Sequence, residues 1–273
     1  MSQTPIPQTP CAPRLRVAGH FGELVQGRIG PHGPLALISL PCPALWVECS
    51  ADGPEHETLI GPNRFAALCR ALNVPIPGKR PTLTATMPPG GGAGSSTAGL
   101  VALARSMGFS GTPRELARIC AQIEGASDPL MFANAERLLF APREGRVLET
   151  LPALPRFDVV GGFFGPVQRT DPVDLAFPDI ADLLTTWRNI MDLPTMAALA
   201  STSAQRTLAL RGPRGDPTER LALDLGALGW MIAHTGNARG LIFRPGAVPG
   251  ATKDRLRDAG FDGVLTFSAG GTV

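Results

Sequence analysis

A run of small residues from Pro88 to Ala98 holds the residue types best suited to binding an anion. It contains four glycines, followed directly by Ser95 and Ser96. Glycine lets backbone N–H groups approach an anion closely, and a helix that begins at either serine would direct its unpaired amides and positive dipole end to the same point. The serine hydroxyls could add a metal ligand. We therefore predict a phosphate-binding loop made of Pro88, Pro89, Gly90, Gly91, Gly92, Ala93, Gly94, Ser95, Ser96, Thr97 and Ala98.

The segments on either side of this run have the patterns of a strand and a helix. Residues 82–87 alternate polar and apolar side chains, as a half-buried strand does, and two prolines follow. Residues 98–107 form a helical pattern of small residues with one packing face. A strand, a glycine loop and a helix in this order suit an anion site, whereas a glycine-rich surface turn is the alternative.

Two familiar phosphate motifs do not fit the run. A Walker loop needs G-x-x-x-x-G-K-[ST], and both lysines of the chain, Lys79 and Lys253, lie outside the run. A dinucleotide fingerprint, G-x-G-x-x-G, has Ser95 where its third glycine belongs. The strand of such a fingerprint should also be apolar on both faces, whereas residues 82–87 include threonines.

Two carboxylates stand four residues apart at the end of the next predicted helix. Residues 112–115 form a capping box with proline at the first helical position, so a helix should run over residues 113–124. Glu124 ends this helix and Asp128 follows it. Because a helix C-terminus disfavours anions, the pair suggests a nearby cation, for which Mg²⁺ with a nucleotide is the obvious candidate. The alternative is an Asp-Pro turn beside an acid that faces water.

Two further segments carry charged residues among glycines. Residues 19–27 follow an apparent strand at residues 15–18 and place Glu23 on a tight turn between glycines. Residues 234–240 precede an apolar strand and contain His234 and Arg239. Each charged residue could equally be a solvated surface group.

Together these segments resemble the motifs of the GHMP kinases. Residues 88–98 resemble the second motif, P-x-x-x-G-L-G-S-S-A, with Ala93 and Thr97 as departures. The G-E-L-x-Q-G pattern within residues 19–27 is similar to that of the L-threonine kinases of cobalamin biosynthesis, although His20 and Phe21 replace a small residue and cysteine. Residues 234–240 take the place of the third, glycine-rich motif.

The resemblance implies a role for each matching residue. ATP would bind to the loop, Ser96 and Glu124 would hold Mg²⁺, and Asp128 would be the catalytic base. The substrate-binding residues would be Glu23, Gln26, His234, Thr235, Gly236 and Arg239. Among these, Arg239 could pair with a substrate carboxylate and Glu23 with an ammonium group.

The resemblance also implies an α+β fold of two domains. Residues 14–150 would form a ribosomal S5 domain 2-like ATP-binding domain, and residues 151–273 a ferredoxin-like domain, with the site between them. The sequence predicts further helices over 63–72, 180–191, 195–210 and from 216 to about 233. It predicts further strands at 35–40, 44–49, 157–162, 240–243 and 263–267.

The expected function is an ATP-dependent kinase that converts L-threonine to O-phospho-L-threonine for cobalamin biosynthesis. Another hydroxylated metabolite, such as homoserine, and a silent ligand-binding regulator are the alternatives. A net charge of +2 with scattered basic residues and few aromatics argues against nucleic-acid binding. No apolar run is long enough for a membrane span, residues 1–13 should form a flexible tail, and five scattered cysteines favour the cytoplasm. A homodimer is compatible with these features.

Overall fold

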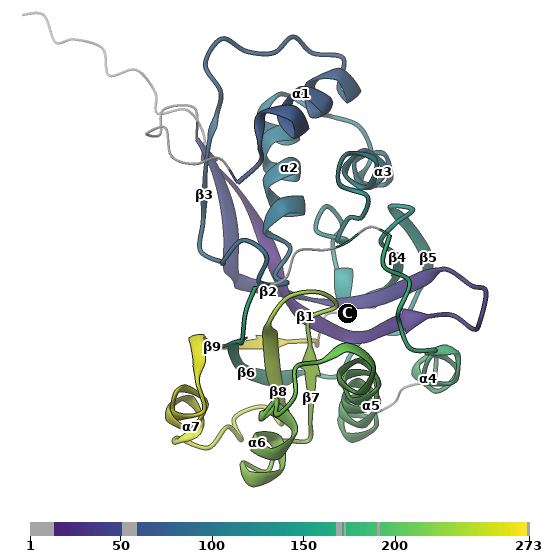
Figure 1. The fold of residues 1–273 in the computed structure, drawn as a ribbon, viewed down its shortest axis with the longest axis vertical. Helices are drawn as coiled ribbons and strands as arrows, with labels where there is room; N and C mark the ends of the chain where they lie inside the picture. The colour runs from purple at the N-terminus through teal and green to yellow at the C-terminus, as the bar shows by residue number, and fades with distance from the viewer. Residues whose placement is uncertain (1–13, 51–58, 168–170, 172, 190–191, 272–273) are drawn as a thin grey trace, which may run out of the picture.

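The computed structural model describes residues 14–50, 59–167, 171, 173–189 and 192–271. Within these residues, nine strands form one sheet in the order β5-β4-β2-β1-β7-β8-β6-β9, with β3 paired to β2 (Figure 1). The paired strands are antiparallel throughout. The strands are β1 (Leu15–Arg28), β2 (Leu35–Ser50), β3 (Thr82–Ala85), β4 (Leu138–Ala141), β5 (Arg146–Thr150), β6 (Phe157–Phe164), β7 (Gly229–Ile232), β8 (Ala238–Phe243) and β9 (Phe261–Ala269).

Helices cover the sheet in two groups. One group lies over β1, β2 and β3 at the top of Figure 1, and the other lies along the lower part of the molecule. The upper group is α1 (Pro62–Ala71), α2 (Ser95–Ser106) and α3 (Pro113–Glu124); the lower group is α4 (Ala181–Trp187), α5 (Leu193–Arg211), α6 (Thr218–Asp224) and α7 (Thr252–Asp258). A short 3-10 helix, η1 (Ala135–Arg137), precedes β4. Helix α2 contacts β1 and β2, while α5 contacts β1 and β7. The predicted α+β class is therefore confirmed.

Strand β1 joins two parts of the sheet, β2–β5 from the first half of the chain and β6–β9 from the second half. It pairs with β2 along its length and with β7 at the residue pair Glu23 and Ile232. The prediction of a short strand at residues 15–18 followed by a tight turn was wrong, because the strand continues to Arg28 with register shifts on the way. One of these irregularities requires glycine at position 22. The φ of Gly22 is +75°, and a Cβ added there would lie 3.1 Å from the Ile232 carbonyl carbon. Glu23 is thus fixed inside the sheet.

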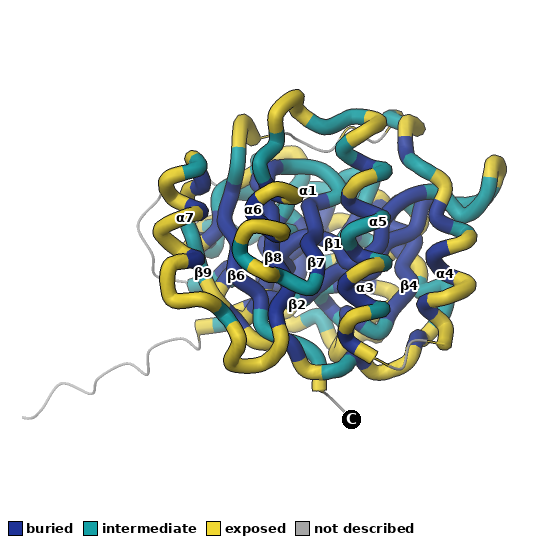
Figure 2. The backbone as a smooth tube through the Cα atoms, turned by 90° about the horizontal axis from the view of Figure 1, so that it is seen from below, coloured by how far each residue is buried: buried dark blue, intermediate teal, exposed yellow. Residues whose placement is uncertain are grey.

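The main hydrophobic core extends through both parts of the molecule. Its buried side chains come from β1, β2, α2 and α3 and also from β6, α4 and α5. Phe21 of β1 makes edge-to-face contacts with Phe163 and Phe267, each with 5.8 Å between ring centroids. Figure 2 shows the buried strands running through the interior, with the exposed positions on the outer helices and loops. Cys69 and Cys120 are buried in α1 and α3.

Local signals located several elements correctly and misplaced others. Helix α3 has the predicted bounds, with both hydrogen bonds of the Thr112 and Glu115 capping box and a left-handed Gly125 at its end. The helix expected to reach about residue 233 was wrong, because α6 ends at Asp224 and strand β7 follows. Strands β4 and β5 and helix α7 were not predicted, and the two strands expected at 35–40 and 44–49 are one, β2.

Some predictions concern residues or boundaries that the fold does not test. The predicted tail, residues 1–13, and the end of the helix predicted over 180–191 lie outside the described residues. Strands β1–β5 come before residue 151 and β6–β9 after it, yet all belong to one sheet, so the two-domain division stays a prediction. Among the described residues, we find no helix with the length and apolar character needed to cross a membrane.

Candidate functional site

The glycine-rich loop connects β3 to α2 and has a conformation that requires glycine. Gly90, Gly92 and Gly94 have φ values of +78°, +74° and +73°. A Cβ on Gly92 would lie 2.1 Å from the carbonyl oxygen of Thr235, and one on Gly94 would lie 2.7 Å from the His20 ring. The loop is therefore held tightly between β1 and the β7–β8 turn.

Helix α2 begins at the end of this loop without a side-chain cap. Its N-cap is Gly94, and no side chain accepts a hydrogen bond from the first turn there. The first amides of a helix have no partner within the helix, so this end can bind an anion. Because the loop and the first turn line a cavity of about 460 Å³, these amides belong to a ligand-sized site.

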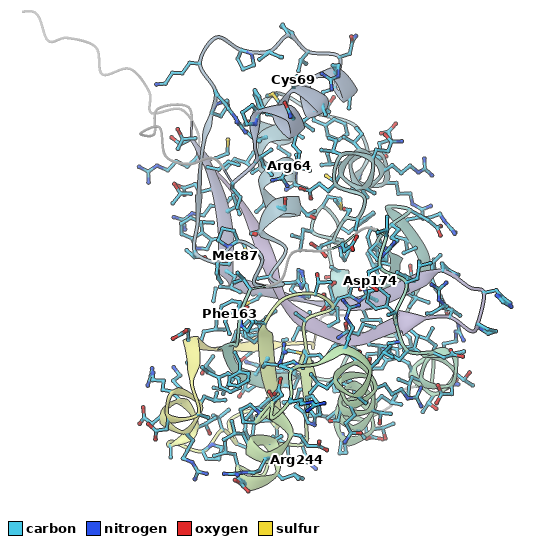
Figure 3. All side chains as sticks on the ribbon, in the orientation of Figure 1. Arg64, Cys69, Met87, Phe163, Asp174 and Arg244 are labelled. Atoms are coloured by element: carbon cyan, nitrogen blue, oxygen red, sulfur yellow. The ribbon has the colours of Figure 1, made fainter. Side chains whose placement is uncertain are left out.

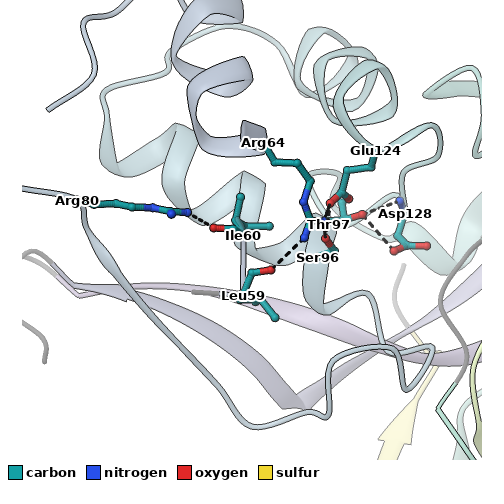
Figure 4. Close-up of polar contacts among 8 residues, drawn as sticks. All are labelled: Leu59, Ile60, Arg64, Arg80, Ser96, Thr97, Glu124 and Asp128. Carbon is teal, nitrogen blue, oxygen red and sulfur yellow. Dashed lines mark hydrogen bonds and ion pairs between the residues drawn. The ribbon is translucent and has the colours of Figure 1, made fainter. Parts of the chain in front are cut away.

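Ser96 and Glu124, the predicted metal ligands, are in direct contact (Figure 4). The Ser96 hydroxyl donates to Glu124 Oε1, and Arg64 Nη1 lies 2.7 Å from the same oxygen and 2.8 Å from Ser96 Oγ. Burial raises the pKa of Glu124, while Ser96 and Arg64 oppose that rise. Figure 3 shows Arg64 extending from α1 toward the start of α2. Arg64 thus supplies one positive charge beside the two predicted metal ligands.

Thr97, the next residue along α2, contacts the predicted base. Its hydroxyl donates to Asp128 Oδ2 over 3.2 Å and accepts from the Asp128 backbone N–H, also over 3.2 Å. Burial alone would raise the pKa of Asp128, but the charge of His20, together with contacts from His20 and Thr97, lowers it overall. Asp128 is therefore ionised at neutral pH and held in place by α2.

His20 and Glu23 of β1, which are both buried, form a cluster with the partly exposed Asp128. His20 Nδ1 lies 3.3 Å from Glu23 Oε1, and its Nε2 lies 3.5 Å from Asp128 Oδ1. Burial lowers the pKa of His20, but the charges of Asp128 and Glu23 outweigh it and raise the pKa to about 9. Burial raises the pKa of Glu23 to about 7 against the opposing charge of His20. Glu23 also accepts a hydrogen bond from the backbone N–H of His234.

The segment around His234 forms another wall of the cavity. The His234 ring stacks on Phe177 with 4.3 Å between centroids and 2° between planes. Burial lowers the pKa of His234 to about 3, with the charge of Arg211 adding to the effect, so the ring is neutral. The guanidinium carbon of Arg211 lies over the Phe177 ring, 4.5 Å from its centroid.

The cavity contains most of the predicted site residues. Those lining it are Pro89, Gly90, Gly92, Gly94, Ser95, Ser96, Thr97, Glu124, Asp128, Glu23, His234 and Thr235. Pro88, Gly91, Ala93 and Ala98 belong to the same loop and helix but do not line it. Gln26 is fully buried, and its side chain donates to the Ile232 carbonyl over 3.0 Å.

Arg239 and Gly236 do not line the cavity that contains Asp128. Both line a second cavity of about 290 Å³, which shares His234 and Thr235 with the first. The Arg239 guanidinium is 2.8 Å from Asp216 Oδ2, and both side chains are almost completely buried. The structure therefore gives Arg239 a partner within the protein rather than a place in the cavity of Asp128.

Sequence reasoning missed several residues of the cavity. In the sequence, His20 is only a departure from the family motif. Its position next to Gly19 in that motif is nevertheless a signal that its imidazole lies in the site. Arg64, Arg143 and Phe177 also line the cavity, but they come from segments without a motif. No local pattern could have identified them, because tertiary packing alone brings them to the site.

Comparison with known proteins gives the fold an independent basis. Residues 63–135 match the model of the GHMP kinases N terminal domain. No curated protein matches the chain by sequence. A solved mevalonate kinase is similar with a TM-score of 0.61 at 12% identity, covering 94% of this chain and 99% of that one.

Two other solved structures are similar to this chain over nearly its full length. The L. major mevalonate kinase in complex with R-mevalonate has a TM-score of 0.60 at 14% identity over 97% of this chain and 98% of its own. A putative homoserine kinase from Listeria monocytogenes has a TM-score of 0.55 at 15% identity over 95% and 96%. At these identities the likeness establishes the fold. The chain therefore has the α+β fold of the GHMP kinases, and its residues 63–135 match their N-terminal domain.

Proposed function

We propose that this protein is an ATP- and Mg²⁺-dependent kinase that phosphorylates the hydroxyl group of a small metabolite, with L-threonine as the leading acceptor. One observation carries the proposal. Consecutive residues in the first turn of α2 contact the two carboxylates, Ser96 with Glu124 and Thr97 with Asp128. The helix end that would bind phosphate, the pair that would hold Mg²⁺ and the carboxylate that would act as base therefore all line one cavity.

Phosphoryl transfer needs little more than such positioning. The transferred group is loosely bonded at the transition state, so catalysis consists mainly of alignment and stabilisation of charge on oxygen. The amides at the start of α2 and in the glycine loop would hold the phosphate oxygens. The tight contact of Gly92 with Thr235 would keep that loop in place.

The residues present fit a magnesium ion. Ser96 Oγ and Glu124 Oε1 are hard oxygen donors in contact with each other, and Mg²⁺ is commonly bound through one or two such groups plus phosphate oxygens. When bound, the ion would neutralise charge on those phosphates. Ser96 and Glu124 would hold it, and Arg64 would give the same carboxylate a second positive neighbour.

Asp128 would orient the acceptor hydroxyl and accept its proton. Its carboxylate is anchored by Thr97 on one oxygen and faces His20 with the other. A base with a low pKa is sufficient here, because the proton of the attacking hydroxyl becomes strongly acidic as its oxygen bonds to phosphorus. Asp128 lines the cavity together with the α2 helix end, as the reaction requires.

The choice of acceptor rests on the G-E-L-x-Q-G segment around Glu23. Its resemblance to L-threonine kinases of cobalamin biosynthesis supports L-threonine, and O-phospho-L-threonine would then feed the aminopropanol arm of that pathway. Glu23 lines the cavity, but its almost fully buried carboxylate already contacts the His20 ring and the His234 backbone N–H, so it would meet a substrate ammonium group only beside these two partners. Homoserine is the second candidate, since solved homoserine kinases are among the similar structures.

Release of ADP from ATP in the presence of Mg²⁺ tests the proposal. L-threonine, homoserine, L-serine and a blank without acceptor are compared, and the phosphorylated product is identified by ³¹P NMR. We expect release with L-threonine and none when EDTA removes the metal. ATP binding without ADP release for any acceptor would contradict the proposal and favour a silent ligand-binding regulator.

A further inference from the structure

His20 lies between two carboxylates that come from distant parts of the chain. Its Nδ1 faces Glu23 on the same strand, and its Nε2 faces Asp128 in the loop after α3. The side chain is only 3% exposed. Ionised carboxylates only accept hydrogen bonds, and an imidazole can donate from both nitrogens only when it is doubly protonated. Asp128, and Glu23 once it is ionised above its pKa of about 7, therefore favour a charged ring.

The glycine loop is shaped around this ring. The His20 backbone N–H donates to the Ala93 carbonyl over 3.1 Å. A side chain on Gly94 would lie 2.7 Å from His20 Cδ2 and 3.1 Å from Nε2. The ring is thus held by the phosphate-binding loop and by β1 at once, and it has little room to rotate.

We infer that His20 is a positioning residue for the base: its doubly protonated ring fixes the orientation of the Asp128 carboxylate, and Glu23 fixes the ring. The inference rests on the proposed function, in which Asp128 must meet the acceptor hydroxyl in one orientation. Thr97 anchors one oxygen of Asp128 and His20 faces the other, so the pair restricts rotation of the carboxylate.

The charges around the ring agree with this role. Burial disfavours the imidazolium, yet Asp128 and Glu23 together raise the pKa of His20 to about 9. The Gly22 carbonyl, 3.4 Å from Nδ1, acts in the same direction. His234 is the other titratable ring near Asp128, and it is neutral because its own pKa is lowered.

Kinetics of His20→Gln test the inference, with His32→Gln as the matched control on the exposed β1–β2 turn. We expect kcat to fall by about 10- to 100-fold, part of the 10²- to 10⁴-fold that a positioned base contributes. The KM for ATP should stay within about twofold, and His32→Gln should match the unchanged protein. A kcat for His20→Gln equal to that of the control would overturn the inference.

NMR titration of the His20 ring gives a test that does not depend on turnover or on a variant at His20. In the unchanged protein the ring should titrate near pH 9, and Asp128→Asn should move the midpoint down by at least one pH unit. A midpoint at the usual 6.5, or one that Asp128→Asn leaves in place, would overturn the inference. Failure of the unchanged protein to release ADP, by contrast, contradicts the proposed function itself.

Discussion

Neighbouring residues in the cavity have separate partners. Ser96 and Thr97 are adjacent and both carry a hydroxyl, yet one contacts the carboxylate of Glu124 and the other that of Asp128. Successive residues of a helix point in directions about 100° apart, which follows from 3.6 residues per turn. One turn of helix can therefore contact the carboxylates of Glu124 and Asp128, the proposed metal ligand and the proposed base, at the same time.

Arg239 shows why a charged residue near a motif needs its surroundings to be interpreted. In sequence it is a cation beside a glycine-rich segment and suits a substrate carboxylate. In the structure its guanidinium forms an ion pair with Asp216, a residue that precedes α6. Asp216 Oδ1 also accepts from the Thr218 backbone N–H over 3.0 Å, so the pair joins the start of α6 to β8.

Asp216→Asn should destabilise the fold. Removing one partner from a buried ion pair commonly costs about 3–5 kcal/mol, since the remaining charge stays buried without compensation. Asp254→Asn, which loses a surface pair with Arg257, is the control and should cost about 0–1 kcal/mol. Urea unfolding measures both. A loss no larger than the control, together with a raised KM for the acceptor, would instead support a substrate role for Arg239.

At the scale of elements, the strand, loop and helix from β3 to α2 were predictable because each local signal agreed. The proline pair ends the strand pattern, glycines with positive φ form the loop, and the serines begin the helix. Helix α3 was predictable for the same reason, since a capping box starts it and Gly125 ends it. Each of these signals acts within a few residues along the chain.

Other elements could not be predicted from local pattern. Residues 218–232 are rich in leucine and alanine without a clear change of pattern, and the turn of residues 225–228, with the left-handed Gly226, separates α6 from β7. Strands β4 and β5 are four and five residues long, too short for a clear alternation. The contacts of Arg64 with Ser96 and Glu124, and of His20 with Asp128, join residues 32 to 108 positions apart, and sequence spacing carries no information about them.

Gly92→Ala should damage the loop specifically. The left-handed conformation costs an L-residue about 1–2 kcal/mol, and the new methyl group would also meet the Thr235 carbonyl oxygen. We expect lower stability in urea and weaker binding of Mg²⁺–ATP in calorimetry. Gly78→Ala is the control, because nothing lies within 4 Å of a Cβ at that position. Equal behaviour of the two variants would show that the loop does not have this tight conformation.

At the scale of the whole molecule, the site lies where the two parts of the sheet meet. Glu23 belongs to the pairing of β1 with β7, and the Gln26 N–H donates to Ser203 Oγ of α5 over 2.9 Å. The glycine-rich loop in turn accepts hydrogen bonds from the backbone N–H groups of Asn237 and Ala238 through the Gly91 carbonyl, each over 3.1 Å. Residues from both parts of the chain therefore hold the cavity in shape.

The shared core predicts a single cooperative unfolding transition. Phe21, Phe163 and Phe267 belong to one cluster that includes residues on both sides of the predicted boundary at residue 150. Far-UV and near-UV circular dichroism should therefore report the same midpoint in urea. Two separated transitions would show that residues 14–150 and 151–273 unfold as independent domains.

The most direct test of the central proposal is turnover by Asp128→Asn beside its binding of nucleotide. ADP release with L-threonine should fall by about 10²- to 10⁴-fold, the contribution of a general base, while the Kd for Mg²⁺–ATP stays within about twofold. Asp254→Asn serves again as the surface control and should retain full turnover. Turnover by Asp128→Asn equal to that of the control would contradict the assignment of Asp128 as the base.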